Sequence, residues 1–303
     1  MRYRIYGMVF ESDLVFPQLM EETTACKADF CIRVSAFPEK VKEHIRENRG
    51  PSGRGEDFYW FNSPGGYFVI LRDKEILLEQ RDREKQDKMK TYLLGYGISM
   101  LLYAGNRMAV HCSAVAKDGS CILLSGHSGA GKSTLAGKLL EHSWKLVADD
   151  VAAVWRRQDS LITAPAFPMR KLCRDAAIRS GYETSELLYI DEDKDKFAVF
   201  CPEQFEEGES RVRGMFVIAP YDGEEVRLEE LSGQDKIQTF LNNLFLHVII
   251  QKEGMEPEKF FAMLEMLSLL PVYKLYRPLQ AVDTSEEMAR LCESIPEILQ
   301  LHG

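Results

Sequence analysis

The chain has 303 residues, of which 45% are hydrophobic, and its formal net charge is −9 at pH 7. This length predicts one large domain plus a smaller one, and the negative balance argues against nucleic-acid binding, which depends on a basic surface. The seven cysteines include no C-x-x-C pair, and the apolar runs are shorter than a bilayer span. We therefore expect a cytoplasmic protein with reduced thiols and no membrane segment.

The amino-terminal part alternates between apolar and polar residues and predicts a small β-rich domain over residues 1–85. It contains no catalytic constellation, so we expect a lid, docking or assembly module. A helical pattern over residues 82–104 then leads into the second domain, residues 86–303. The expected strands are 3–10, 29–34, 58–61, 67–71 and 75–78, with a hairpin turn at Asp73-Lys74 and a short helix over 38–45.

Asp118-Gly119, flanked by two apolar runs, predicts a two-residue β-hairpin turn. If Lys117 pairs with Ser120, then His111 lies opposite Gly126. This register places the imidazole at the rim of the loop described next. A histidine at the start of a strand also has a purely structural interpretation, and both remain open here.

A Gly-x-x-x-x-Gly-Lys-Ser pattern follows the second strand of this hairpin and precedes a helical segment, the setting of a phosphate-binding loop. Glycines let the backbone turn tightly, and its amides can converge on an anion at the helix start. The alternative is an ordinary glycine turn, which the strand–loop–helix context disfavours. We expect Lys132 to reach the terminal phosphates of ATP and Ser133 to bind Mg²⁺. The predicted nucleotide-binding residues are Gly126, His127, Ser128, Gly129, Ala130, Gly131, Lys132, Ser133 and Thr134.

Asp149 and Asp150 follow a short apolar strand, residues 144–148, where a phosphotransferase needs carboxylates. Adjacent carboxylates raise one another's pKa, so one can hold the metal or Lys132 while the other accepts a proton. An exposed Asp-Asp turn is the structural alternative. We expect Asp149 at the metal and both aspartates in catalysis.

The remaining half carries cations that are candidates for phosphate or acceptor contact, namely Arg170 and Arg213. Solvent-exposed charges are the alternative interpretation for Arg170. Residues 184–196 carry many charges of both signs and predict a mobile loop. Amphipathic patterns predict helices over 232–250 and 258–270, and a strand over 272–276.

Together, His111-Cys-Ser-Ala-Val, the loop from Ser125 to Thr134 and Leu146-Val-Ala-Asp-Asp-Val resemble the HPr kinase/phosphorylase family. That family has a phosphate-binding-loop fold related to ATP-dependent phosphoenolpyruvate carboxykinases. The resemblance implies an α/β core with a mixed sheet, Asp150 as the base for an accepting serine and His111 as the functional histidine. It also places the loop lysine at Lys132 and the magnesium serine at Ser133. The family usually has Glu where this chain has Thr134, and Asp175 and Arg213 are only positional matches to its downstream motifs.

The segment from Tyr6 to Pro17 resembles the short HPr-kinase-related proteins found beside peptide-modification genes. These include kinases that phosphorylate the carboxy-terminal serine of lasso-peptide precursors. The resemblance implies an ATP- and Mg²⁺-dependent serine kinase with a peptide or protein substrate, and it is compatible with a homo-oligomer. The alternatives are an HPr-type serine kinase/phosphorylase, a small-molecule kinase, and a nucleotide-sensing module without transfer activity.

Overall fold

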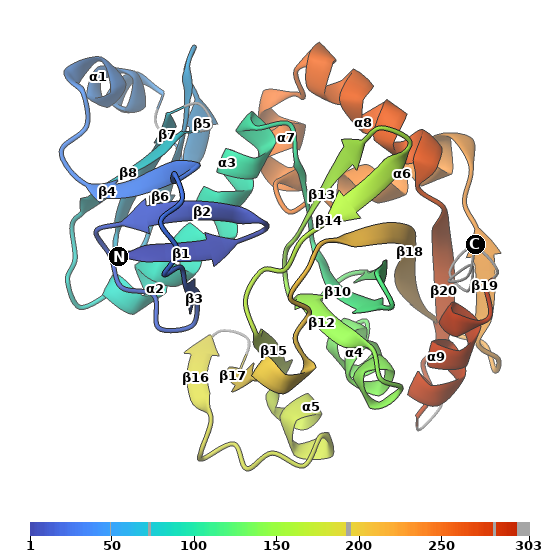
Figure 1. Ribbon diagram of the computed structural model, residues 1–303. Coiled ribbons are helices and arrows are strands. Elements are labelled where there is room, and N and C mark those ends of the chain that lie inside the picture. Colours follow the sequence, from blue (N-terminus) through green and yellow to red (C-terminus); the bar gives the residue numbers. More distant parts are fainter. Residues whose placement is uncertain (49, 72–73, 192–194, 281–282, 296–303) are drawn as a thin grey trace. The chain divides into compact units, whose positions relative to one another are not determined.

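The computed structural model describes residues 1–48, 50–71, 74–191, 195–280 and 283–295 (Figure 1). It divides into two units, and each consists of two separate stretches of chain. Met1–Ala109 and Leu244–Ala262 form the first unit, and Val110–Asn243 and Met263–Gly303 form the second. The predicted α/β class is confirmed. This division differs from the predicted one at residues 85 and 86, because the sequence pattern does not show that residues 244–262 return to the first unit.

The first unit contains an eight-stranded sheet in the order β3-β1-β2-β4-β8-β7-β6-β5. The strand predicted over residues 3–10 is a hairpin instead, because Tyr6 and Gly7 adopt positive φ values of 51° and 72° and turn the chain. The predicted pairing of residues 67–71 with 75–78 is confirmed, whereas its turn residue Asp73 lies outside the described residues. The elements are β1 (Arg2–Ile5), β2 (Met8–Ser12), β3 (Met20–Glu21), β4 (Phe30–Val34), α1 (Glu39–Glu47), β5 (Ser52–Arg54), β6 (Phe58–Ser63), β7 (Gly66–Leu71) and β8 (Glu75–Gln80).

The helical segment after this sheet is interrupted by one π-helical turn. It comprises α2 (Gln86–Tyr92), the π turn Leu93–Gly97 and α3 (Ile98–Ala104). Gly95 lies in that turn, where an added Cβ would be 3.3 Å from Cζ of Phe245. Close packing at this glycine therefore accompanies the local departure from α-helical geometry.

Residues 244–262 belong to the first unit through polar as well as apolar contacts. Glu256 accepts hydrogen bonds from the hydroxyl groups of Tyr59 (3.0 Å) and Tyr103 (2.8 Å). Its carboxylate also lies 3.0 Å from the guanidinium of Arg54. These bonds join positions about 150 to 200 residues apart, a separation that short-range periodicity does not report. This stretch contains α7 (His247–Glu253) and the beginning of α8 (Pro257–Leu269).

The second unit contains a mixed sheet in which the long strand β18 is central. β18 pairs in parallel with β11 along one edge, and its other edge pairs with β14 near its start and with β20 further on. On the edge of β18 that pairs with β11, the strands follow outward in the order β11-β10-β12. The strands are β9 (Met108–Val110, at the division), β10 (Cys112–Lys117), β11 (Ser120–Ser125), β12 (Lys145–Ala148), β13 (Ala152–Arg157), β14 (Ser160–Thr163), β18 (Ser210–Tyr221), β19 (Arg227–Glu230) and β20 (Val272–Pro278).

The predicted hairpin of β10 and β11 forms in the expected register. Lys117 pairs with Ser120 and Cys112 pairs with Ser125, around a turn in which Asp118 and Gly119 have positive φ. On its other edge β10 pairs antiparallel with β12, with Ala114 opposite Ala148. β11 and β12 therefore both end at the same edge of the sheet, where the loop and the two aspartates follow.

A separate three-stranded sheet lies between residues 169 and 200, in the order β15-β17-β16. It is formed by β15 (Met169–Cys173), β16 (Leu188–Asp191) and β17 (Lys196–Phe200), and α5 (Arg174–Arg179) packs on it through buried alanines and Leu172. The mobile loop predicted over residues 184–196 is therefore wrong for residues 188–191, which form β16, and for Lys196, which begins β17, while residues 192–194 lie outside the described residues. Short strands with charged neighbours give almost no alternation signal.

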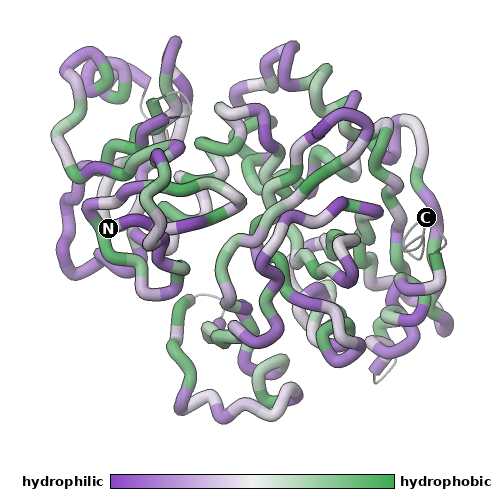
Figure 2. The backbone as a smooth tube through the Cα atoms, in the orientation of Figure 1, coloured by the Kyte–Doolittle hydropathy of each residue, from purple (hydrophilic) through white to green (hydrophobic). Residues whose placement is uncertain are grey.

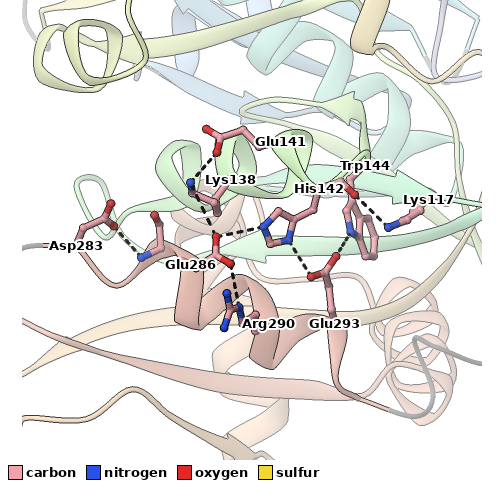
Figure 3. A network of polar contacts seen from close by, with 10 residues as sticks. Lys117, Lys138, Glu141, His142, Trp144, Asp283, Glu286, Arg290 and Glu293 are labelled. Atoms are coloured by element: carbon pink, nitrogen blue, oxygen red, sulfur yellow. Dashed lines mark hydrogen bonds and ion pairs between the residues drawn. The ribbon is translucent and has the colours of Figure 1, made fainter.

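Helices cover the main sheet of the second unit and close its hydrophobic core. Leu135, Leu139 and Leu140 of α4 (Lys132–Glu141) pack with Met288 and Cys292 of α9 (Ser285–Glu293) in one buried cluster. Figure 2 shows hydrophobic stretches along the inner strands of this unit and hydrophilic stretches on outer turns. Polar groups also join α9 to the end of α4 (Figure 3).

The single helix predicted over residues 232–250 is instead two helices, because the chain breaks at Asn243 between α6 (Gly233–Asn242) and α7. The backbone carbonyl of Asn243 accepts a 2.8 Å hydrogen bond from the amide of His111, and this distant partner replaces continued helix bonding. A short 3₁₀ turn forms at Pro202–Gln204. Within the described part of the chain, no helix combines the length and apolar character needed to cross a bilayer.

Candidate phosphate-binding site

A glycine loop joins β11 to α4, and three of its glycines have positive φ values. These are 129° for Gly126, 81° for Gly129 and 113° for Gly131. A Cβ added at Gly126 would lie 2.6 Å from the carbonyl oxygen of Ile218, whereas one at Gly129 would have no atom within 4 Å. The backbone path thus requires glycine, and the loop amides precede the positive end of a ten-residue helix.

Lys132 is the first residue of α4, and its side chain folds back over the loop. Its Nζ donates hydrogen bonds to the carbonyl oxygens of Gly126 (2.7 Å) and His127 (3.2 Å). Burial and then the charge of Lys196 lower the pKa of the Lys132 ammonium, while Asp150 opposes that shift. Lys132 is therefore close enough to Asp150 to feel its charge, but its hydrogen bonds go to the loop.

Asp149 is buried and holds two neighbouring elements together. Its Oδ1 accepts a 2.6 Å hydrogen bond from the hydroxyl of Ser113, and its Oδ2 accepts one of 2.6 Å from the amide of Lys171. The carboxylate thus joins β10 to β15. The structure does not pair Asp149 with Lys132, which was one of its two expected partners.

Asp150 has a different environment, although it is the next residue. Its φ is +76°, a left-handed conformation that is rare for aspartate and that aims its side chain differently from that of Asp149. Oδ2 lies 2.7 Å from Nζ of Lys171, and Oδ1 lies 3.6 Å from Nε2 of His111. Burial alone would raise the pKa of Asp150, but the charges of Lys171 and His111 outweigh it and lower the pKa overall. The mutual rise expected for adjacent carboxylates does not prevail, because Asp150 has cationic neighbours.

The structure brings His111 to the predicted place at the loop. Its backbone is fixed twice, because its amide donates to Asn243 and its carbonyl lies 2.6 Å from the hydroxyl of Ser125. That hydroxyl also lies 2.8 Å from Oδ1 of Asn243. Asn243 is therefore a supporting residue of the site that the amphipathic pattern of α6 concealed.

Ser133 and Arg170 meet on the first turn of α4. The Ser133 hydroxyl lies 3.5 Å from the carbonyl oxygen of Lys171, and its own backbone carbonyl accepts a 2.7 Å hydrogen bond from Nη2 of Arg170. Arg170 is only 6% exposed, and a Cβ at Gly137 would be 2.9 Å from its Nη2. Arg170 thus supports the helix that follows the loop. The structure does not show its guanidinium extending into the space that a phosphate group would occupy.

Arg213 and Asp175 are not brought to the loop. Nε of Arg213 lies 3.3 Å from the hydroxyl of Ser120, at the opposite end of β11 from Gly126. Asp175 is exposed on the first turn of α5. The parallel pairing of β11 with β18 explains the position of Arg213, because residues early in β18 lie beside the beginning of β11.

The other predicted loop residues follow the backbone path. His127 is exposed, with its Nδ1 3.0 Å from the carbonyl oxygen of Ser128. Ala130 is buried, and its carbonyl accepts a 3.1 Å hydrogen bond from Nε of Arg277 on β20. Thr134 is partly exposed in the first turn of α4.

Magnesium fits the oxygen donors of this site. Ser133 and Asp149 both contact the backbone of Lys171, and a hydroxyl and a carboxylate are the hard oxygen ligands that Mg²⁺ prefers. Among the described residues, no three His, Cys, Asp or Glu side chains converge as a metal site. Such a donor set suits an ion that takes most of its ligands from phosphates and water, as Mg²⁺ does in nucleotide sites.

Comparison with known proteins gives one partial sequence match and a distant structural one. A family model described as SynChlorMet cassette protein ScmC matches residues 80–175, which include the hairpin, the loop and both aspartates. None of the curated proteins matches. The Hpr(Ser) kinase/phosphatase from Coxiella burnetii is similar at 14% sequence identity over 64% of this chain and 96% of that chain, with a TM-score of 0.30. This similarity is too distant to assign chemistry.

Proposed function

We propose that the second unit binds ATP with Mg²⁺ on the loop 126–134 and transfers the γ-phosphoryl group to a serine hydroxyl. One juxtaposition carries the proposal: the glycine loop after β11 and Asp150 after β12 lie at the same edge of one sheet. An anion cradle beside an ionised carboxylate has the two parts that phosphoryl transfer requires. A module that only senses nucleotide needs the cradle alone.

The residues would divide the reaction as follows. Asp150 accepts the proton of the serine hydroxyl, the serine oxygen forms a bond to the γ-phosphorus, and the bond to the bridging oxygen breaks to release ADP. Lys132 and the loop amides stabilise the charge on the phosphates. His111, 3.6 Å from Asp150, orients that carboxylate. Ser133 and Asp149 would hold Mg²⁺, which supplies further charge neutralisation when bound.

For the acceptor we propose a peptide with a carboxy-terminal serine, of the lasso-peptide precursor type. Two points support this choice. The segment from Tyr6 to Pro17 resembles kinases that tailor such peptides, and the matching family model is described as a cassette protein. An acceptor encoded in the same gene cluster would fit both points.

Incubation with γ-labelled ATP, Mg²⁺ and a panel of serine-terminated peptides tests the proposal. Asp150→Asn should abolish transfer and retain ATP binding, whereas Lys132→Ala should impair both. Asp159→Asn, at an exposed aspartate in the same unit, is the matched control and should behave as wild type. Transfer by Asp150→Asn at a near wild-type rate would remove the base assignment. Binding of ATP without transfer to any peptide would favour a sensing module.

A further inference from the structure

We propose that Lys171 is a second phosphate-binding residue, paired with Asp150 before nucleotide binds and with the terminal phosphate of ATP afterwards. The proposal rests on the proposed function, since it concerns the same loop. It assigns a role to a residue that lies 39 positions beyond Lys132 and outside the glycine motif. Lys171 therefore acts as a positioning residue that couples nucleotide binding to the release of Asp150.

Every polar group of Lys171 contacts a residue of the site. Its amide donates to Oδ2 of Asp149 (2.6 Å), and its carbonyl oxygen lies 3.5 Å from the hydroxyl of Ser133. Its ammonium donates to Oδ2 of Asp150 (2.7 Å). The backbone of Lys171 is thus held beside the magnesium serine, so its long side chain begins within the phosphate site wherever its tip points.

The cationic side chains around the loop favour the binding of an anion in addition to the two aspartates. Lys132 begins α4, Lys171 is paired with Asp150, and Lys196 lies on β17, which pairs with β15. The charge of Lys196 acts on both Asp150 and Lys132. Two of these lysines come from the three-stranded sheet, on β15 and β17. These three lysines stand in a chain whose net charge is −9. Such a cluster is stabilised when a triphosphate binds.

The ion pair with Asp150 is suited to exchange. A lysine ammonium is a compact charge on a flexible stem and binds phosphate as readily as carboxylate. When the γ-phosphate binds the Lys171 ammonium, the Asp150 carboxylate loses its ion-pair partner. Asp150 is then available to accept the proton of the serine hydroxyl. Asp150 and ATP therefore compete for the same cation, and this competition is measurable as binding.

A double-mutant cycle monitored by isothermal titration calorimetry with Mg²⁺–ATP tests the competition. Lys171→Met should weaken ATP binding about tenfold, the loss expected for one charge-assisted hydrogen bond, with a smaller loss for ADP. Asp150→Asn should tighten ATP binding several-fold because it releases Lys171. In the Lys171→Met background the same Asp150→Asn change should give a clearly smaller gain. Lys145→Met, at an exposed lysine on β12, is the control and should bind ATP like wild type.

The cycle separates the two proposals. If wild type binds no ATP, the proposed function fails first. If wild type binds ATP and the Asp150→Asn gain is equally large with and without Lys171, general electrostatics explains the gain and the role of Lys171 is refuted. Should Lys171→Met fail to fold by circular dichroism, Lys171→Gln replaces it in the same cycle. Lys171→Arg, which keeps the charge, should restore most of the ATP affinity.

Discussion

The hydroxyl of Ser113 donates a 2.6 Å hydrogen bond to Oδ1 of Asp149, across β10 and the end of β12. With the Lys171 amide on Oδ2, both oxygens of Asp149 are engaged by the protein, whereas Asp150 faces movable cationic side chains. The two adjacent aspartates therefore have different environments. Asp149 joins two elements of the fold, and Asp150 faces the side chains of Lys171 and His111.

Asp149→Ala should destabilise the protein more than Ser113→Ala does. Removal of Asp149 leaves a buried hydroxyl and a partly buried amide without their acceptor, at a cost of about 2–4 kcal/mol, against about 1 kcal/mol for Ser113→Ala. Urea unfolding measures both. Asp159→Ala, at an exposed position, should change the free energy of unfolding by less than about 0.5 kcal/mol. Equal losses in the free energy of unfolding for Asp149→Ala and Asp159→Ala would contradict the role of Asp149 in joining β10 to β15.

The glycines of the loop should differ in their tolerance of alanine. Gly126→Ala combines a positive φ with a 2.6 Å clash against Ile218, so we expect a loss of about 3 kcal/mol or more. Gly129→Ala meets no atom within 4 Å and carries only the conformational strain, about 1–2 kcal/mol. Chemical denaturation without nucleotide compares them. The order of the two losses is the prediction, and its reversal would show that the loop path differs.

Gly137→Ala tests how tightly Arg170 packs against α4. Alanine in a helix interior normally stabilises by about 1 kcal/mol, but here its Cβ would lie 2.9 Å from Nη2 of Arg170. We expect Gly137→Ala to destabilise wild type and to stabilise the Arg170→Ala variant. Thermal melting of the four proteins measures this sign change. A stabilising effect in both backgrounds would mean that Arg170 yields without cost.

His142, at the end of α4, carries a pH-dependent tie to α9 (Figure 3). Its Nδ1 lies 2.9 Å from Glu293 and its Nε2 lies 3.2 Å from Glu286. The hydrogen bond to Glu293 outweighs burial and, with that to Glu286, raises the pKa of His142 above its ordinary 6.5. Lys138, Glu141, Lys117, Asp283 and Arg290 are the other charged groups of this network.

Because the folded-state pKa of His142 is raised, its contribution is complete below pH 6.5 and is lost as the pH rises through the folded value. The stability difference between wild type and His142→Gln should therefore be larger at about pH 5.5 than at about pH 9. Urea unfolding at the two pH values measures it. His44→Gln, which removes a histidine outside the network, is the control. A stability difference that does not vary with pH would show that His142 forms no ion pair with Glu286 or Glu293.

Local sequence signals predicted the hairpin and the backbone path of the glycine loop. Asp118-Gly119 fixes the hairpin register, and the register places His111 beside the loop, because a two-residue turn leaves no freedom in strand pairing. The glycines of the loop require positive φ, which a side chain would oppose. These features depend on residues that are close together in the sequence, so local sequence patterns are enough to predict them.

Features that depend on distant partners were missed. The break at Asn243 is stabilised by the backbone of His111, and the position of Arg213 depends on the parallel pairing of β18 with β11. Lys171 is not among the residues that the sequence predicts for the site, because its importance lies in contacts with Asp149, Asp150 and Ser133. No periodicity in the chain encodes such contacts.

The split composition of the first unit matters for anyone who wishes to produce either half alone. The chain crosses the division after Ala109, Asn243 and Ala262. A fragment beginning at Val110 would carry Glu256 but neither of the tyrosines that donate to it. A fragment that corresponds to the second unit should therefore omit residues 244–262, instead of being obtained by truncation at a single point.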